Sequence, residues 1–279
     1  MGDDSLHLYY LPAAYFSHRI MIALAEKKLE YQQTVVDINK NEQNQPWYLR
    51  VNPKGQIPAL RIGGRIIPES LRIMEAVDKH PKGQGPRLVP DESTPVGKLV
   101  KEWREKIHSF PIRVITFGII LNPENHTDEL KVPKFLIGSK EAYAKSVADL
   151  IPYFEQLKKD NPDITEAVNV KMEAARNNDM ARFGLENVEK ILKEVDKTFD
   201  EAEAQLQKNK KANPPVLWLC GPDFTAADIT LCVFLGRMDF IGILKRFVDP
   251  VKRPALKEYW DRAFQRPSVR QTVTKVPTN

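Results

Sequence analysis

Glu69 and Ser70 are the residues whose types and position most directly suggest chemistry. They follow a short apolar strand predicted over residues 65–67, and they open a predicted helix. Free N–H groups at a helix start, together with a hydroxyl and the helix dipole, favour a bound carboxylate. The Glu69 carboxylate can pair with an ammonium group. The pair therefore fits the amino-acid end of a small peptide, and the alternative interpretation is an ordinary helix cap.

Ile57 and Pro58 supply a second part of the same candidate site. Proline in a strand-like run is typical of a sheet edge or a cis turn, because proline has no N–H to donate. An edge beside a helix start can hold a short extended peptide through main-chain pairing. We therefore expect Pro58 to be cis and Ile57 to present its backbone to a ligand.

The composition limits the possible classes of function. The chain has 279 residues, 42% of them hydrophobic, so it can bury one large core or two smaller ones. The net charge of +5 comes from 42 basic and 37 acidic residues that are interspersed, which argues against nucleic-acid binding. Cys220 and Cys232 form no CxxC motif, and neither His7 nor His18 has a second histidine at metal spacing. We expect no disulfide framework and no metal.

The sequence predicts a cytoplasmic protein without a membrane span. The most apolar run, residues 229–244, is interrupted by Arg237 and Asp239, so we interpret it as a buried helix. The polar N-terminus has no features of a secretory signal.

The elements that must position the candidate site follow the order β-α-β-α-β-β-α in the first ninety residues. The segment 81–95, rich in proline, glycine and charge, predicts a linker, and everything after it has helical periodicity. We expect a first domain over residues 1–82, a linker over residues 83–97, and a helical domain over residues 98–279. An insert is expected at about residues 122–182, longer than usual connections between helices.

Three features organise the helical half. Residues 97–121 predict one helix with a bend at Pro111, and residues 140–158 predict an amphipathic helix. Apolar residues recur between Leu185 and Leu206 at steps of three and four, which indicates a seam of an intramolecular hairpin or of an intermolecular coiled coil. Thr225 and Asp228 have capping-box spacing before an apolar helix, a structural role.

Together these features resemble the glutathione S-transferase superfamily over nearly the full chain. The resemblance rests on Ile57-Pro58, Glu69-Ser70 and Thr225-Ala226-Ala227-Asp228. It implies an α+β thioredoxin-like N-terminal domain followed by an all-α C-terminal domain, here with a long helical insert. It also implies glutathione as co-substrate or ligand, a hydrophobic acceptor site between the domains, and often a homodimer.

A narrower resemblance, to the family of ganglioside-induced differentiation-associated protein 1, rests on residues 44–52, 118–124 and 161–163 and on the insert. Members of that family carry an apolar C-terminal segment and a mitochondrial outer-membrane anchor. Residues 274–279 contain nothing apolar of that kind. Anchoring in the mitochondrial outer membrane is therefore unsupported, and the cytoplasm is the expected location.

The resemblance also implies a role for each residue of the glutathione site. Ser70 would bind the γ-glutamyl carboxylate and Glu69 the free ammonium. Ile57, beside a cis Pro58, would pair with the cysteinyl backbone. The glycine carboxylate would be reached by two further residues, Lys54 and Gln56.

The group that stabilises the glutathione thiolate is expected in the loop after the first strand. Tyr10, Tyr15 and Ser17 are the candidate hydroxyls, and the alternative is that the tyrosines only pack. Ala14 occupies the position where several related classes place a serine or cysteine. Because the loop has no cysteine, transfer chemistry through a mixed disulfide is disfavoured.

The function expected from these residues is glutathione binding, with conjugation of glutathione to hydrophobic electrophiles by a tyrosine-stabilised thiolate. The alternative is a non-catalytic sensor or scaffold of the same fold that uses the insert to meet partners. A third possibility is a binder of fatty acids or other apolar ligands.

Overall fold

The computed structural model describes residues 4–122, 131–132 and 140–274. Its first layer is a four-stranded sheet in the order β2-β1-β3-β4. β1 runs parallel to β2, β3 runs antiparallel to both β1 and β4, and the strands are Leu6–Tyr10 (β1), Gln32–Val35 (β2), Ala59–Ile62 (β3) and Arg65–Pro68 (β4).

Alternation along the strands places helices on both faces of this sheet. Leu8 and Tyr10 belong to the main core with helices α1 (Tyr15–Glu26) and α3 (Ser70–Asp78). Tyr9 belongs to a separate cluster with Tyr48 of helix α2 (Pro46–Val51). Period-two side-chain alternation explains this division. The thioredoxin-like first domain is thus confirmed.

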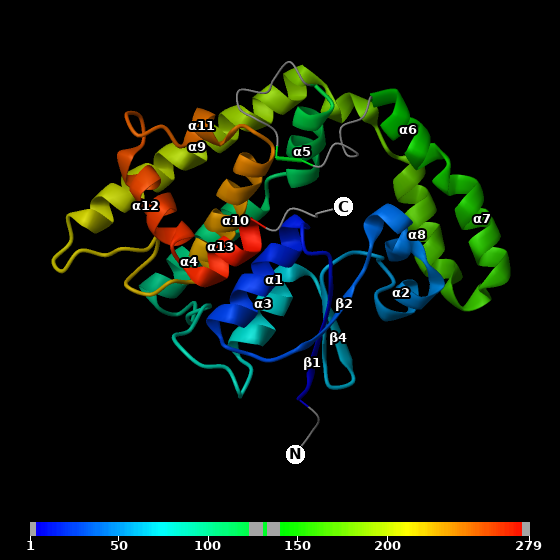
Figure 1. Cartoon of the computed structure of the whole chain (residues 1–279), viewed down its shortest axis with the longest axis horizontal. Helices are drawn as coiled ribbons and strands as arrows, with labels where there is room; N and C mark the ends of the chain where they lie inside the picture. Colours follow the sequence, from blue (N-terminus) through cyan, green and yellow to red (C-terminus); the bar gives the residue numbers. More distant parts are fainter. Residues whose placement is uncertain (1–3, 123–130, 133–139, 275–279) are drawn as a thin grey trace.

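The remainder of the described chain is helical (Figure 1). Its helices are α4 (Pro95–His108), α5 (Ile112–Ile120), α6 (Lys140–Ala148), α7 (Leu150–Asp160), α8 (Thr165–Arg176), α9 (Leu185–Lys210), α10 (Ala226–Phe240), α11 (Leu244–Phe247), α12 (Pro254–Phe264) and α13 (Pro267–Val273). α1 packs against α10 and α13, so the two domains share one core.

The prediction of one helix over residues 97–121 was wrong. α4 ends at His108, and α5 begins at Ile112 after Pro111, which is the N-cap of the second helix. Proline lacks an N–H and its ring clashes with the preceding turn, so it separates two helices here instead of bending one. The predicted helix over residues 140–158 is likewise two helices, α6 and α7, which meet at Asp149. Residues 123–130 and 133–139 of the expected insert lie outside the described residues.

The seam on α9 packs within the chain. Leu192, Val195 and Phe199 have no exposed surface, and α9 lies along α12 and α5. Leu185, the first residue of the pattern, is 38% exposed. The periodicity therefore reflects an intramolecular helix packing.

Helices α6, α7 and α8 fill the insert and lie beside α2, at the edge of the molecule away from α12 (Figure 1). Leu49 of α2 packs with a small separate core of the insert that includes Phe154, Leu157 and Val168. The insert is therefore anchored to the first domain, close to the expected glutathione site.

Candidate functional site

A cavity of about 380 Å³ gathers most of the residues predicted to bind glutathione. Its lining comprises Phe16, Ile38, Gln43, Gly55, Gln56, Ile57, Pro58, Glu69, Ser70 and His108. The lining residues come from α1, the turns before α2, the segment before β3, the start of α3 and the end of α4. Both domains thus contribute to one site.

The start of α3 forms one end of this cavity. Glu69 is the N-cap and has a positive φ, with φ 70° and ψ 114°. Ser70 is the first helical residue and is 5% exposed. A residue other than glycine is costly at positive φ, and such backbone strain concentrates at functional sites. The conformation carries the chain from β4 straight into the helix, so the α3 N-terminus faces the cavity with its N–H groups uncapped by any side chain.

The segment before β3 forms the adjoining wall. The Ile57-Pro58 bond is cis, as expected. Ile57 precedes the paired register, which begins at Ala59 opposite Tyr9. The carbonyl oxygen of Gln56 accepts hydrogen bonds from the Tyr48 hydroxyl and the Asn52 side chain, both at 2.7 Å. Two donors therefore fix the peptide group ahead of Ile57, whose backbone is left at the rim of the sheet.

Lys54 lies differently from the expectation. Its Nζ is 2.6 Å from Oε1 of Glu69, and both side chains are substantially exposed. The ammonium of Lys54 is therefore at the end of the cavity expected to hold the γ-glutamyl group.

A second cavity of about 230 Å³ adjoins the first. Its lining is mainly apolar and comprises Leu11, Ala13, Ala14, Tyr15, Phe16, Ile38, Asn39, Ile112, Arg113, Thr116, Phe117, Ile120, Arg237 and Phe240. Phe16 and Ile38 line both cavities. An apolar compartment beside a more polar one is the arrangement needed to bring a hydrophobic molecule to a group held next to it.

The three hydroxyls predicted to stabilise a thiolate are engaged elsewhere. Tyr10 donates to Oε1 of Gln33 at 2.8 Å, and burial raises its pKa. Oγ of Ser17 accepts from the backbone N–H of Leu11 at 3.3 Å, and Ser17 has no exposed surface. Neither residue is among those that line the two cavities.

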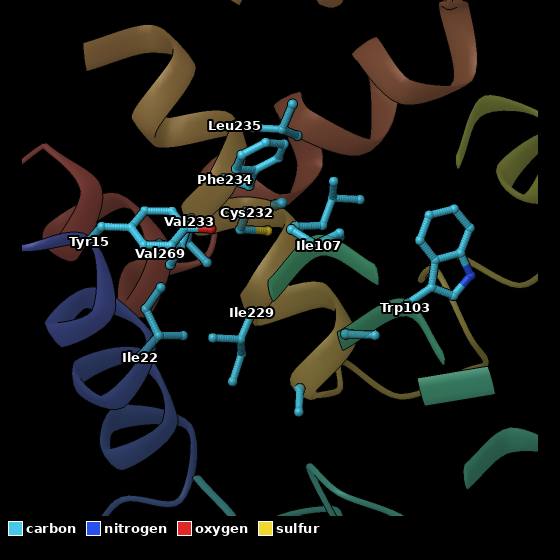
Figure 2. Close-up of a cluster of buried hydrophobic side chains, with 14 of the residues drawn as sticks. Tyr15, Ile22, Trp103, Ile107, Ile229, Cys232, Val233, Phe234, Leu235 and Val269 are labelled. Atoms are coloured by element: carbon cyan, nitrogen blue, oxygen red, sulfur yellow. The ribbon is translucent and has the colours of Figure 1, made fainter. Parts of the chain in front are cut away.

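Tyr15 lines the second cavity, but its hydroxyl turns into the core. It accepts a hydrogen bond from Nη2 of Arg19 at 2.7 Å. Figure 2 shows its ring among buried side chains that include Cys232, Val233 and Phe234. The catalytic role of these three hydroxyls stays a prediction, and their described contacts do not favour it.

His108 is a cavity residue that the sequence reasoning missed. It ends α4, and its Nδ1 lies 2.8 Å from Nη1 of the fully buried Arg19. Because a guanidinium only donates, Nδ1 accepts, and a neutral ring then carries its proton on Nε2. Burial and the Arg19 charge lower the pKa of His108, which favours that neutral form. The available signal was an arginine four residues after Tyr15 and a histidine before Pro111, but nothing local links them.

The N-terminus of α1 also points to the junction of the two cavities. Its N-cap is Ala14, without a side-chain hydrogen bond, and Ala14 and Phe16 line the second cavity. The first N–H groups of a helix have no intrahelical partner and carry partial positive charge. Negative charge at the junction is therefore favoured even though Ala14 has no functional group.

The described residues hold no group of three or more histidine, cysteine, aspartate or glutamate side chains suited to a metal ion. Among the helices described, none is long and apolar enough to cross a bilayer.

Two family models and several curated relatives match this chain. The family model for the glutathione S-transferase N-terminal domain matches residues 15–80, and the model for the C-terminal domain matches residues 180–262. Human ganglioside-induced differentiation-associated protein 1-like 1 is 27% identical over 99% of this chain and 75% of its own length. Glutathione S-transferase TCHQD of Arabidopsis thaliana is 24% identical over 96% of this chain and 89% of its own length.

Solved structures share the fold. The beta-etherase LigF from Sphingobium sp. strain SYK-6 has a TM-score of 0.66 at 24% identity, covering 96% of this chain and 98% of that one. Ure2p in complex with glutathione has a TM-score of 0.62 at 18% identity, covering 98% and 94%. The order of elements, the paired cavities and both family models agree: the chain belongs to the glutathione S-transferase superfamily.

Proposed function

We propose that this protein binds glutathione in the first cavity and transfers it to hydrophobic electrophiles bound in the second. The observation that supports this proposal is the convergence of Glu69, Ser70 and Ile57 on one cavity whose end is an uncapped helix start. The γ-glutamyl carboxylate binds at Ser70, and its ammonium binds Glu69. The cysteinyl backbone pairs with Ile57, which directs the sulfur toward the second cavity.

The thiolate is held by two groups at the junction of the cavities. The N–H groups at the start of α1 stabilise the charge on sulfur, and Nε2–H of neutral His108 donates a hydrogen bond to it. The thiol proton leaves to solvent. The sulfur then attacks an electrophilic carbon, forming a C–S bond while the leaving group departs with its electron pair.

Calorimetric titration of glutathione tests the binding site. We expect Ser70→Ala and Glu69→Gln each to weaken affinity about tenfold or more, because each removes a charge-assisted contact. Arg72→Gln, an exposed neighbour on α3, is the control and should bind as the wild type does. Unchanged affinity in both site variants would leave Glu69 and Ser70 with only a structural role at the start of α3.

Turnover needs a separate test. His108→Phe should lower the rate of conjugation to a chloronitrobenzene by about a hundredfold, while affinity for S-methylglutathione stays within a factor of two, about 0.4 kcal/mol. Tyr10→Phe and Tyr15→Phe complete the set, because a loss confined to either would assign the thiolate to a tyrosine after all.

The second candidate function is a non-catalytic sensor, scaffold or apolar-ligand binder. The apolar lining of the second cavity supports ligand binding without chemistry. Glutathione binding without turnover toward any electrophile would favour this function. Homodimer formation and a cytoplasmic location stay predictions, which sedimentation at several concentrations and cell fractionation would test.

A further inference from the structure

Lys171 of the insert reaches the wall of the glutathione cavity from the other domain. Its Nζ donates to the carbonyl oxygen of Gly55 at 2.9 Å, across 116 positions of sequence. Gly55 lines the cavity next to Gln56 and Gln43. A β-carbon built on Gly55 would lie 2.4 Å from Cε of Lys171, so the backbone and the end of the lysine side chain are in direct contact.

Among the described residues, no carboxylate comes within 4.0 Å of the Lys171 ammonium. Burial, together with repulsion from the guanidinium of Arg113, lowers the pKa of Lys171 to about 8. A half-buried cation with one carbonyl partner retains two free N–H donors and favours an anion beside it.

The insert holds Lys171 in place through independent contacts with the first domain. Leu49 of α2 packs with Phe154 and Val168 in the small core of the insert, and the exposed Arg50 adds two hydrogen bonds to Asp163 of 2.7 and 3.1 Å. The Tyr153 hydroxyl donates to the carbonyl oxygen of Asn44 at 3.3 Å. α8 therefore sits at a fixed position beside the turns that precede α2.

The position of Lys171 matches one end of an extended tripeptide. With the γ-glutamyl group on Ser70 and the cysteinyl backbone at Ile57, the glycyl residue extends along the wall toward Gly55. Lys54, the cation expected there from the sequence, is paired with Glu69 at the opposite end. Lys171 is thus the described cation in contact with the Gly55 end of the wall.

We infer that Lys171 binds the glycyl carboxylate of glutathione, so that the insert completes the glutathione site. This inference rests on the proposed function and adds a specificity-determining residue supplied by helix α8.

The test compares two ligands on one protein. Calorimetry measures glutathione and γ-glutamylcysteine, which lacks the glycyl residue, against wild type, Lys171→Met and Lys54→Met. We expect Lys171→Met to weaken glutathione about tenfold or more and γ-glutamylcysteine less than about twofold. Lys54→Met should affect both ligands equally, because it acts at the shared γ-glutamyl end. Lys159→Met, an exposed lysine of the same insert, is the control.

Three outcomes count against the inference. Equal losses for both ligands in Lys171→Met, or a selective loss in Lys54→Met instead, would overturn it while leaving glutathione binding intact. If Lys171→Met fails to fold, binding of the glycyl ethyl ester of glutathione to the wild type replaces it as the test. We expect this ester, whose glycyl carboxylate is blocked, to bind about tenfold more weakly than glutathione, and equal affinity would overturn the inference. Wild type that binds neither peptide would refute the proposed function itself.

Discussion

At the scale of single residues, Arg19 and His108 connect the two domains inside the candidate site. Arg19 of α1 is fully buried, donates to Tyr15 and His108, and lies 5.2 Å from the ring of Phe16. In the described residues, no carboxylate lies within 4.0 Å of its guanidinium. The Tyr15 hydroxyl and the His108 imidazole accept its hydrogen bonds, and the aromatic ring faces stabilise its charge. The pair fixes the imidazole ring and its tautomer at the edge of the cavity.

The lowered pKa of His108 predicts a pH dependence of stability. Folding favours the neutral imidazole, so the contribution is complete above the unfolded value of 6.5 and is lost as the pH falls through the lower folded value. Between about pH 7 and about pH 5, the melting temperature of wild type should therefore fall more steeply than that of His108→Gln. Parallel curves for the two proteins, from scanning calorimetry at several pH values, would contradict this assignment.

Gly55 cannot be replaced at this wall without strain. Its φ is +55°, and an added β-carbon would lie 2.4 Å from the carbonyl oxygen of Gln43, a backbone atom that cannot turn away. We expect Gly55→Ala to destabilise the protein by about 2 kcal/mol or more in urea unfolding. Gly64→Ala is the matched control, since that glycine has open space around it. A difference of less than about 0.5 kcal/mol between the two variants would show that the wall relaxes easily.

At the scale of elements, the start of α10 shows how one buried cap orders several segments. The Asp228 carboxylate accepts from the backbone N–H groups of Thr225 and Leu219 at 2.8 and 2.9 Å, and from the Tyr259 hydroxyl at 3.0 Å. Asp228 has no exposed surface. One side chain thereby ties α10 to the preceding loop and to α12.

Removing the side-chain hydroxyl should destabilise the protein more at a buried helix cap than at an exposed one. Thr225→Ala is expected to cost about 1 to 2 kcal/mol of the free energy of unfolding, because a buried hydroxyl and its contact with Asp228 are lost. Thr94→Ala, at the exposed cap of α4 where the hydroxyl accepts from Gly97, should cost less, about 0.5 to 1 kcal/mol. Urea unfolding of both variants measures the difference, and equal costs would mean that burial of the cap adds nothing.

The sequence predicted those features that depend on a few neighbouring residues. The cis Pro58, the helix start at Ser70 and the cap at Thr225 each follow from short runs of residue types. The division at Pro111 was misjudged as a bend because sequence alone does not show whether neighbouring helices support a continuous axis. Periodicity on α9 was clear, yet only the folded chain shows that its partners are α5 and α12.

The site was predictable only in its contiguous parts. Residues 56–58 and 69–70 lie close in sequence and were predicted together, and all of them line the first cavity. His108 lines the same cavity, and Lys171 contacts Gly55 in its wall, each from another helix, and no spacing rule connects them to the site. Tyr10 was predicted as a candidate hydroxyl near the first cavity loop, but strand alternation turns its ring to the α1 and α3 face, where its hydroxyl meets Gln33.

At the scale of the whole molecule, the insert is bound to the first domain by a small apolar core and by a surface ion pair, and the core contributes more to the stability of the contact. Phe154 is 1% exposed and packs with Leu49, Leu157, Val168 and neighbouring residues. The Arg50 to Asp163 pair is about half exposed on both sides, at 48% and 56%. Exposed ion pairs contribute little because water screens them, whereas buried aromatic side chains contribute several kcal/mol.

The larger contribution of the apolar core predicts which substitution detaches the insert and how detachment affects ligand binding. Phe154→Ala should raise amide hydrogen exchange throughout α6, α7 and α8 while α9 and α10 stay protected, because the insert has its own small core. Arg50→Ala, the surface control, should change exchange little. If Lys171 binds the glycyl carboxylate, Phe154→Ala should also weaken glutathione several-fold but leave γ-glutamylcysteine nearly unchanged, since the ammonium is no longer held at Gly55. A uniform rise in exchange across both domains would instead mean that the insert and the main core unfold as one unit. Loss of affinity for both peptides would place the effect of Phe154→Ala at the γ-glutamyl end.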